Sequence, residues 1–371
     1  MELITMKKVL MIASTVSHLE NFHMPYIEYL HDRGVEVYTA TAGKLRSEYV
    51  TRHISLPYRK KLYHPLNIFV ILKLAMLMRK ERFDTVYTNS SLAGYTGRKA
   101  LKLSGRKNTM SVHICHGYLF NDDGSSRSRF YLHFEKSVRR RTDILAVMND
   151  ADYKIAKKYS LGKEVVFING MGVDASRFTR IDGSTMQRIR RELGASEKTV
   201  VFLCVGEFSP RKNQQCIIKA CSLLGDDMDY RMVFAGDGKL LEKCKKYAHE
   251  LGVYGKMAFW GHTRNTNMLY RSCDVLISAS RFEGLPFNVM EALHCGMEII
   301  VSNVKGNRDL AKIYRGKMFQ YDNAQELAVV MRGVRRLPHM DNDVTPQSFT
   351  TNANFLLDNV FEDNIKLLKM L

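Results

Sequence analysis

Short apolar runs alternate with longer segments of helical periodicity along most of this chain of 371 residues. Runs such as Val9–Ala13 and Thr199–Val205 are apolar throughout, which favours strands buried on both faces of a parallel sheet. Several of the helical segments between such runs end at a glycine, as at Gly34 and Gly105. This alternation predicts an α/β fold built on parallel sheets.

The length and the pattern together predict two domains. A strand beginning near Val165 runs into Gly170 and Gly172, and the polar stretch Thr179–Thr185 follows. The strand–helix rhythm then starts again at Thr199, so we place a hinge near residues 172–185. The predicted divisions are a first domain, a second domain and a C-terminal amphipathic segment, at residues 1–175, 186–345 and 346–371.

The first strand–helix turn contains histidines but no glycine. Ser14–His23 lacks the G-x-G-x-x-G pattern of dinucleotide-binding folds, which argues against an NAD or FAD enzyme. His18, Phe22 and His23 are candidates to face a ligand from the tip of this strand. Packing or helix capping is the alternative for each of them.

The segment from Glu283 to Glu291, Glu-Gly-Leu-Pro-Phe-Asn-Val-Met-Glu, is the most informative stretch of the chain. It follows the predicted strand Cys273–Ser280 and leads into a helix, because Pro286 suits a first turn and Gly296 suits a C-terminal cap. The amide groups and dipole at such a helix start favour an anion. Carboxylates on either side accept hydrogen bonds from sugar hydroxyls. Two unrelated acids on a surface helix are the alternative.

Two further loops of the second half lie at predicted strand ends. Arg211 and Lys212 follow the strand Thr199–Val205, and two adjacent cations there can neutralise a departing diphosphate. The alternative is a pair of ordinary exposed basic residues. Gly236 begins a tight Gly-Asp-Gly turn, which lets the backbone approach a ligand closely.

A formal net charge of +18 requires an anionic partner or surface. The chain has no zinc-finger spacing, RNA-recognition signature or basic heptad helix, so nucleic acid is the weaker candidate. Basic clusters such as Arg79-Lys80 and Arg98-Lys99 favour the anionic inner leaflet of a membrane. Apolar residues in Leu66–Lys80 could enter that surface, although core packing is the commoner role.

Seven dispersed cysteines indicate free thiols in a reducing compartment and give no zinc-site spacing. No run reaches the roughly 18 apolar residues that a membrane span needs. No D-x-D metal motif occurs at the expected position, so we predict no metal ligands and no cofactor. These features predict a cytoplasmic protein associated peripherally with the inner face of the membrane.

The motif E-G-L-P-x-x-x-x-E resembles the E-x7-E signature of glycosyltransferase family 4. Three further stretches strengthen the resemblance to its capsular and exopolysaccharide subgroup, namely His116-Gly117, Gly170–Phe178 and Gly306-Asn-Arg-Asp-Leu310. The resemblance implies a GT-B fold, in which two Rossmann-like domains face each other across a cleft. It also implies that the last helix crosses back to the first domain.

The resemblance also implies residue roles. Glu283 would contact the donor sugar and Glu291 the ribose, while His116, which follows the strand Thr109–Cys115, would contact the sugar from another side. Lys212 falls on the family's phosphate-binding lysine. The remaining donor contacts implied are the loop residues His262 and Thr263, which would seat the base, and the helix-start residues Gly284, Leu285 and Phe287.

The implied function is retaining transfer of a sugar from a UDP-sugar to an undecaprenyl-diphosphate-linked saccharide, without a metal. His18, Phe22 and His23 would then face the acceptor. Glu207 replaces a family arginine, and Glu298 stands where the family has proline. These departures favour the alternative of a non-catalytic GT-B binding subunit in a polysaccharide assembly complex.

Overall fold

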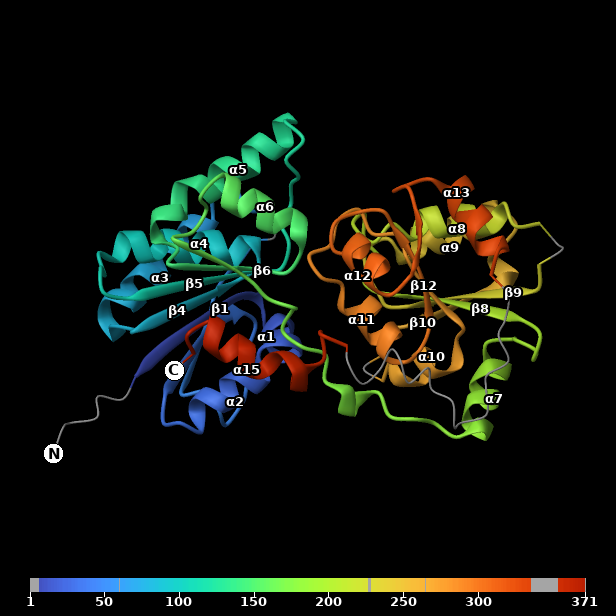
Figure 1. The fold of residues 1–371 in the computed structure, drawn as a ribbon, viewed down its shortest axis with the longest axis horizontal. Helices are drawn as coiled ribbons and strands as arrows, with labels where there is room; N and C mark the ends of the chain where they lie inside the picture. The colour runs from blue at the N-terminus through green and yellow to red at the C-terminus, as the bar shows by residue number, and fades with distance from the viewer. Residues whose placement is uncertain (1–6, 60, 226–227, 264, 335–352, 371) are drawn as a thin grey trace. The chain divides into compact units, whose positions relative to one another are not determined.

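The computed structural model describes residues 7–59, 61–225, 228–263, 265–334 and 353–370. The chain divides into two compact units (Figure 1). The first unit combines Met1–Gly172 with Val360–Leu371, and the second is Val173–Asn359.

The first unit is built on a parallel sheet of seven strands in the order β3-β2-β1-β4-β5-β6-β7. Its strands are β1 Lys8–Thr15, β2 Glu36–Ala42, β3 Arg52–Ser55, β4 Thr85–Asn89, β5 Met110–Cys115, β6 Ile144–Val147 and β7 Glu164–Phe167. Its α-helices are α1 Val16–Phe22, α2 Met24–His31, α3 Asn67–Glu81, α4 Ser91–Ser104, α5 Ser126–Val138, α6 Asp150–Lys158 and α15 Leu357–Leu367.

The second unit is built on a parallel sheet of six strands in the order β10-β9-β8-β11-β12-β13. Its strands are β8 Val200–Val205, β9 Tyr230–Ala235, β10 Met257–Gly261, β11 Val275–Ser278, β12 Glu298–Ser302 and β13 Lys317–Phe319. Its α-helices are α7 Gly183–Glu192, α8 Gln214–Ser222, α9 Leu241–Glu250, α10 Asn267–Ser272, α11 Phe287–His294, α12 Asn307–Ile313 and α13 Ala324–Arg332. The α/β class with two Rossmann-like sheets is therefore confirmed.

Both faces of the second sheet are covered, and this explains why its strands are apolar throughout. Phe202 and Phe234 pack toward α8, α9 and α13, whereas Leu203 and Val233 pack toward α7, α10 and α11. In the first unit, α3 and α4 cover one face of the sheet, and α1, α2 and α15 lie on the other (Figure 1). Parallel strands buried on two sides require this pattern.

Each sheet has a switch point, where the order of the strands reverses direction. It lies between β1 and β4 in the first unit and between β8 and β11 in the second. Ligands of open parallel sheets bind at the carboxyl ends of the strands near such a point. The segments ending in His23 and containing Glu283 both follow strands that flank a switch point.

Helix α15 belongs to the first unit from Val360 onward, although it lies at the end of the chain. Asn364 donates hydrogen bonds to the Tyr26 hydroxyl at 2.8 Å and to the Gly170 carbonyl at 2.9 Å. Phe361 stacks on Tyr26, and Figure 1 places α15 beside α1 and α2. The expectation that the last helix packs on the first domain is confirmed. The predicted irregular stretch from Pro338 to Thr351 lies outside the described residues.

Arg98 corrects one part of the predicted basic surface. Its side chain is fully buried and donates hydrogen bonds to Glu135 at 2.9 Å, to Thr142 at 3.1 Å and to the Gly94 carbonyl at 2.8 Å. The prediction that this charge faces a membrane was wrong, because a buried, fully paired guanidinium holds α4 against α5 instead.

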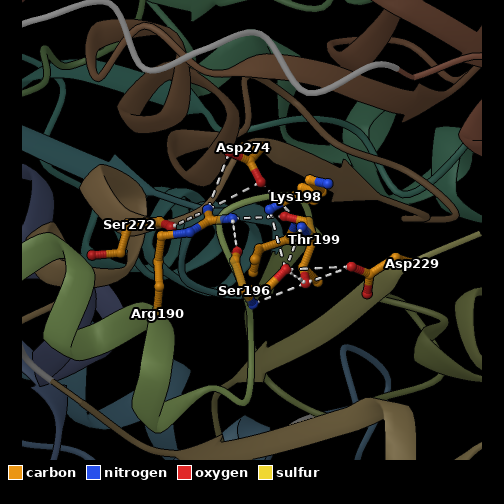
Figure 2. Close-up of polar contacts among 8 residues, drawn as sticks. Arg190, Ser196, Lys198, Thr199, Asp229, Ser272 and Asp274 are labelled. Atoms are coloured by element: carbon orange, nitrogen blue, oxygen red, sulfur yellow. Dashed lines mark hydrogen bonds and ion pairs between the residues drawn. The ribbon is translucent and has the colours of Figure 1, made fainter.

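A second buried ion pair joins α7 to the sheet of the second unit (Figure 2). Arg190 donates to both carboxylate oxygens of Asp274 at 3.2 Å and to the carbonyls of Ser272 and Thr199. Asp274 also accepts a hydrogen bond from the Val201 amide at 2.7 Å. The two side chains are only 5% and 9% exposed.

Replacing Arg190 with methionine is expected to lower the unfolding free energy of the second unit by about 3–5 kcal/mol, because Asp274 would remain buried without a countercharge. Trp260, the chain's single tryptophan, lies in β10 and reports urea unfolding of this unit by fluorescence. Arg188→Met is the matched control. It lies on the same helix, pairs with Glu192 at the surface and should cost no more than about 0.5 kcal/mol. Equal urea-unfolding transitions for Arg190→Met and Arg188→Met would contradict the stabilising role assigned to Arg190.

Candidate active site

Glu283 lies between two cations in the loop that connects β11 to α11. One carboxylate oxygen, Oε1, accepts from Arg211 Nη1 at 2.7 Å and from Lys212 Nζ at 2.8 Å. The side chains of Glu283 and Lys212 are 10% and 12% exposed, whereas that of Arg211 is 39% exposed. Glu283 thus forms one charged cluster with Arg211 and Lys212, which lie 72 and 71 positions before it in the sequence.

This cluster keeps Glu283 ionised despite its burial. Desolvation alone would raise the pKa of the carboxyl group, but the charges of Lys212 and Arg211 outweigh it and lower that pKa below its usual value. Hydrogen bonds from Lys212 and Ser280 act in the same direction. At neutral pH the site therefore holds one carboxylate and two cations, with a net positive charge.

Backbone contacts hold the surrounding loops close together. The Arg281 amide donates to the Arg211 carbonyl at 2.7 Å, which joins the loop after β11 to the loop after β8. Gly306 precedes α12, and a Cβ atom built there would lie 2.4 Å from the Gly284 carbonyl oxygen. Only glycine allows that approach, and Gly306 also has a φ of +78°. The Gly306-Asn-Arg-Asp-Leu310 signature thus braces the loop that contains Glu283.

Helix α11 begins immediately after this loop. Pro286 is its N-cap, Phe287 is its first residue, and Gly296 follows the end with a φ of +78°. Leu285 and Phe287 are partly buried and pack against the core beneath the sheet. These contacts fix the positive end of the helix dipole near the Glu283 cluster.

Glu291 lies on the second turn of α11 and is held by a tyrosine. The Tyr270 hydroxyl of α10 donates to Glu291 Oε2 at 2.7 Å. Burial raises the pKa of Glu291, and this hydrogen bond partly offsets the effect. Nothing in the local sequence pattern indicates this role for Tyr270, which lies 21 positions earlier.

A pocket of about 390 Å³ opens at the carboxyl ends of β8, β9 and β10. Three of the predicted donor-binding residues, Gly236, His262 and Thr263, line it. Its other lining residues are Val205, Gly206, Glu207, Ala235, Asp237 and Thr266. None of these six was predicted as a site residue, although Asp237 and Thr266 lie within three positions of Gly236 and Thr263.

Two glycines connect the pocket to the charged cluster. A Cβ atom built on Gly236 would lie 2.2 Å from the Gly206 carbonyl oxygen, so only glycine fits there. A Cβ atom on Gly206 would lie 3.1 Å from Lys212 Cε. The Lys212 stem therefore lies against a residue that lines the pocket, and its ammonium group reaches Glu283.

The histidines of the first unit form their own cluster. The ring centroids of His18 and His116 are 4.4 Å apart, and His23 lies 5.4 and 5.5 Å from them. Phe22 contacts the edge of the His18 ring at 5.0 Å. Burial lowers the pKa of His18 to about 4 and those of His23 and His116 well below their ordinary value, so all three rings are neutral at pH 7.

The predicted site residues therefore fall into two groups, one in each unit. The donor candidates gather at the carboxyl edge of the second sheet, and the histidines gather at the carboxyl edge of the first. Glu298 stands apart, because it begins β12 at the opposite edge and pairs with Lys317 at 3.1 Å on the surface. Glu207 lines the pocket.

Family models match both halves of the chain. Residues 26–177 match the model described as Glycosyltransferase Family 4, and residues 185–347 match Glycosyl transferases group 1. The protein EpsD of Bacillus subtilis (strain 168) is 29% identical over 310 residues, which cover 82% of this chain and 81% of EpsD.

Two further similarities concern a named enzyme and a solved structure. The UDP-Gal:alpha-D-GlcNAc-diphosphoundecaprenol alpha-1,3-galactosyltransferase of Escherichia coli is 28% identical over 65% of this chain and 63% of its own length. The Anabaena protein Alr3699/HepE, crystallised with UDP and glucose, superposes with a TM-score of 0.73. That superposition covers 98% of this chain and all of HepE at 16% identity, and so it concerns the fold. Taken with the E-x7-E loop and the two Rossmann-like sheets, these matches assign the chain to glycosyltransferase family 4, with the GT-B fold.

Proposed function

We propose that this protein is a retaining glycosyltransferase that moves a sugar from a UDP-sugar to a lipid-linked saccharide in bacterial capsular or exopolysaccharide synthesis. The observation that carries the proposal is the Glu283 side chain, held between Arg211 and Lys212 beside an open pocket. Sugar transfer from a nucleotide requires compensation of the charge that develops on the departing diphosphate.

The two cations supply that compensation. Lys212 and Arg211 are both partnered by Glu283. A bound diphosphate draws them toward its oxygens, and the Glu283 carboxylate becomes available to accept hydrogen bonds from sugar hydroxyls. The positive end of α11 adds to the same field.

The pocket suits the nucleoside part of the donor. Gly206 and Gly236 line it and expose their backbone to it, and His262 and Thr263 also line it. A flat base can pack against these two glycines, and backbone groups of the loop at His262 and Thr263 can form hydrogen bonds with the edge of that base. Glu291, oriented by Tyr270, is our candidate for the ribose hydroxyls.

The first unit is our candidate for the acceptor side. The Escherichia coli relative is named for a diphosphoundecaprenol-linked substrate, which supports a lipid-linked saccharide as the acceptor class here. We propose that His18, Phe22 and His23 face that acceptor and that His116 contacts the transferred sugar.

An exposed apolar surface on α3 supports peripheral binding of the protein to a membrane. Four large side chains on successive turns point outward and are 46–66% exposed, namely Ile68, Phe69, Leu72 and Met76. Exposed Arg79 and Lys80 lie at the end of the same helix. Exposed Arg127 and Arg129 lie at the start of α5, where Phe130 contacts Tyr63, a residue shortly before α3. None of the helices in the described part of the chain could span a bilayer. We propose that this surface binds the anionic inner leaflet peripherally.

Replacing both Ile68 and Phe69 with glutamate is expected to weaken binding to phosphatidylglycerol vesicles by at least about tenfold. The change removes two apolar side chains, each worth about 1.5–3 kcal/mol when buried, and adds repulsive charge. Vesicle co-sedimentation measures the effect. Val329→Glu, which changes an equally exposed apolar residue of the second unit, should leave binding unchanged. Unaltered sedimentation of the double variant would refute the assigned surface.

The function is tested by incubating the protein with labelled UDP-sugars and undecaprenyl-diphosphate-linked N-acetylglucosamine. The proposal predicts a labelled lipid-linked disaccharide from at least one donor. Binding of UDP without transfer or hydrolysis under any of these conditions would favour the non-catalytic alternative instead. That alternative now rests on Glu207, because Glu298 lies away from the pocket.

A further inference from the structure

Ser90 connects a strand directly to a helix in the first unit. Strand β4 ends at Asn89 and helix α4 begins at Ser91, so a single residue makes the turn between them. The φ of +70° and ψ of +164° at Ser90 lie in a backbone region that essentially only glycine occupies. Such a conformation costs free energy, and it persists only where the surrounding structure enforces it.

Contacts with the neighbouring strand β5 enforce this turn. The Ser90 amide donates a hydrogen bond to the Ile114 carbonyl at 3.3 Å, and the Ser90 carbonyl accepts one from the Gly94 amide at 2.8 Å. A Cβ atom built on Gly94, one turn into α4, would lie 2.2 Å from the His113 ring. The start of α4 is therefore pressed against β5, which explains the sharp turn at Ser90.

Polar side-chain atoms at this turn lack partners. Serine is a common N-cap residue, yet the Ser90 side chain makes no capping hydrogen bond with α4. Ser90 Oγ and Asn89 Oδ1 are both buried without a hydrogen bond to the described residues. Asn89 Nδ2 donates to the Ile12 carbonyl at 3.2 Å, which fixes the position of the unpaired oxygen. Buried polar atoms of this kind cost free energy unless a water or a ligand satisfies them.

The turn lies at the edge of the sheet that we propose for the acceptor. Strand β4 lies between β1 and β5 and flanks the switch point of the first sheet. Asn89 is paired with Ile114, two residues before His116. Open parallel sheets bind ligands at this place, and strained backbone gathers at ligand sites. A serine hydroxyl is uncharged and both donates and accepts, which suits a sugar hydroxyl better than a diphosphate.

We propose that the Ser90 hydroxyl binds a hydroxyl group of the acceptor's sugar and so helps to select the saccharide that is extended. This inference deepens the proposed function and rests on it. Ser90 is partly exposed, so a change of its χ1 rotamer can turn Oγ from its buried position toward a ligand. The role also explains why the position is not glycine, which would relieve the strain but supply no hydroxyl.

The variant Ser90→Gly separates the hydroxyl from the strain. It should not lower the midpoint of urea unfolding, followed by circular dichroism, because relief of the strain offsets the greater freedom of glycine in the unfolded chain. It should lower kcat/KM for undecaprenyl-diphosphate-linked N-acetylglucosamine by about 5- to 50-fold, because one hydrogen bond to the acceptor is lost. UDP affinity should stay unchanged.

Ser160→Gly is the matched control. Ser160 is also a serine with a positive φ, of +49°, but it is exposed between α6 and β7 at the opposite edge of the same sheet. Its replacement should likewise not lower the unfolding midpoint, and kcat/KM should remain at the wild-type value. The comparison therefore separates the loss of the Ser90 hydroxyl from the general effect of glycine at a positive φ.

Acceptor analogues that each lack one hydroxyl of the sugar, other than the reacting one, identify the group that Ser90 binds. One analogue should be a poorer substrate of the wild-type enzyme by about the same factor as the Ser90→Gly change. For that analogue, Ser90→Gly should lower kcat/KM no further, because the two changes remove the same hydrogen bond. A full additional loss with every analogue would contradict the assigned contact.

Wild-type kcat/KM in Ser90→Gly would overturn the inference while leaving the proposed function intact. A lower unfolding midpoint would also overturn it, because the turn would then not carry the strain from which the role is inferred. An equal fall in UDP affinity and kcat/KM would show damage beyond the acceptor side and would count against it as well. If the wild-type enzyme transferred no sugar from any UDP-sugar, the proposed function would fail, and this inference with it.

Discussion

Replacing Glu283 with glutamine is expected to lower kcat/KM by about 100- to 1,000-fold, the effect of losing one preorganised electrostatic partner. The same change should leave UDP affinity equal or higher. Glu283 pairs with Lys212 and Arg211, and a neutral amide would compete less with a diphosphate for these two cations. Steady-state kinetics and calorimetric titration with UDP measure the two effects separately.

Glu298→Gln is the matched control for that experiment. Glu298 also pairs with a lysine, but at the surface and at the opposite edge of the same sheet. Its activity should stay within about threefold of wild type, as surface ion pairs contribute little. Activity of Glu283→Gln within that same range would remove Glu283 from the site.

Replacing Lys212 with alanine is expected to raise the barrier for transfer by about 2–4 kcal/mol and also to weaken UDP binding. Here kcat/KM and UDP affinity should fall together, because the proposed role of Lys212 is to contact the diphosphate in both the bound donor and the transition state. The direction of the UDP effect is thus opposite to that of Glu283→Gln. Titrating both variants with UDP therefore distinguishes a residue that binds the diphosphate from a residue that binds the sugar.

Lys219→Ala provides the control for Lys212, because Lys219 is an exposed lysine on α8 of the same unit. It should alter neither kcat/KM nor UDP affinity. If Lys212→Ala behaved like Lys219→Ala in both measurements, the proposed phosphate contact would be wrong. Lys212→Arg should recover part of the activity, since it keeps the charge but changes the geometry.

The sequence predicted most strands of both sheets because they are buried on two sides and therefore apolar throughout. Strand β3 went unnoticed, since its residues Arg52–Ser55 bury only Ile54 and lack an apolar run. Helix α7 overlaps a segment that we took as a polar hinge. Asp182 caps it, but only Ile189 and Arg190 are buried, so its charged surface concealed its periodicity.

For the candidate site, local spacing predicts less than the fold does. Local spacing places Glu283 and Glu291 on either side of a helix start, and α11 does begin between them. It could not show that Lys212 and Arg211 bind one oxygen of Glu283, because that contact depends on how β8 and β11 pair in the sheet. Arg98 was taken for a surface charge, since its burial depends on Glu135, which lies 37 positions away.

We propose that the second unit binds a nucleoside diphosphate with its phosphates at Lys212 and its base in the pocket of Gly236 and Thr263. A crystal structure of the protein with bound UDP is the decisive measurement. We expect diphosphate density within hydrogen-bond distance of Lys212 Nζ, the uracil beside His262 and Thr263, and the ribose at Glu291. UDP bound elsewhere, or an ordered crystal at saturating UDP with this pocket empty and the Lys212–Glu283 pair unchanged, would contradict it.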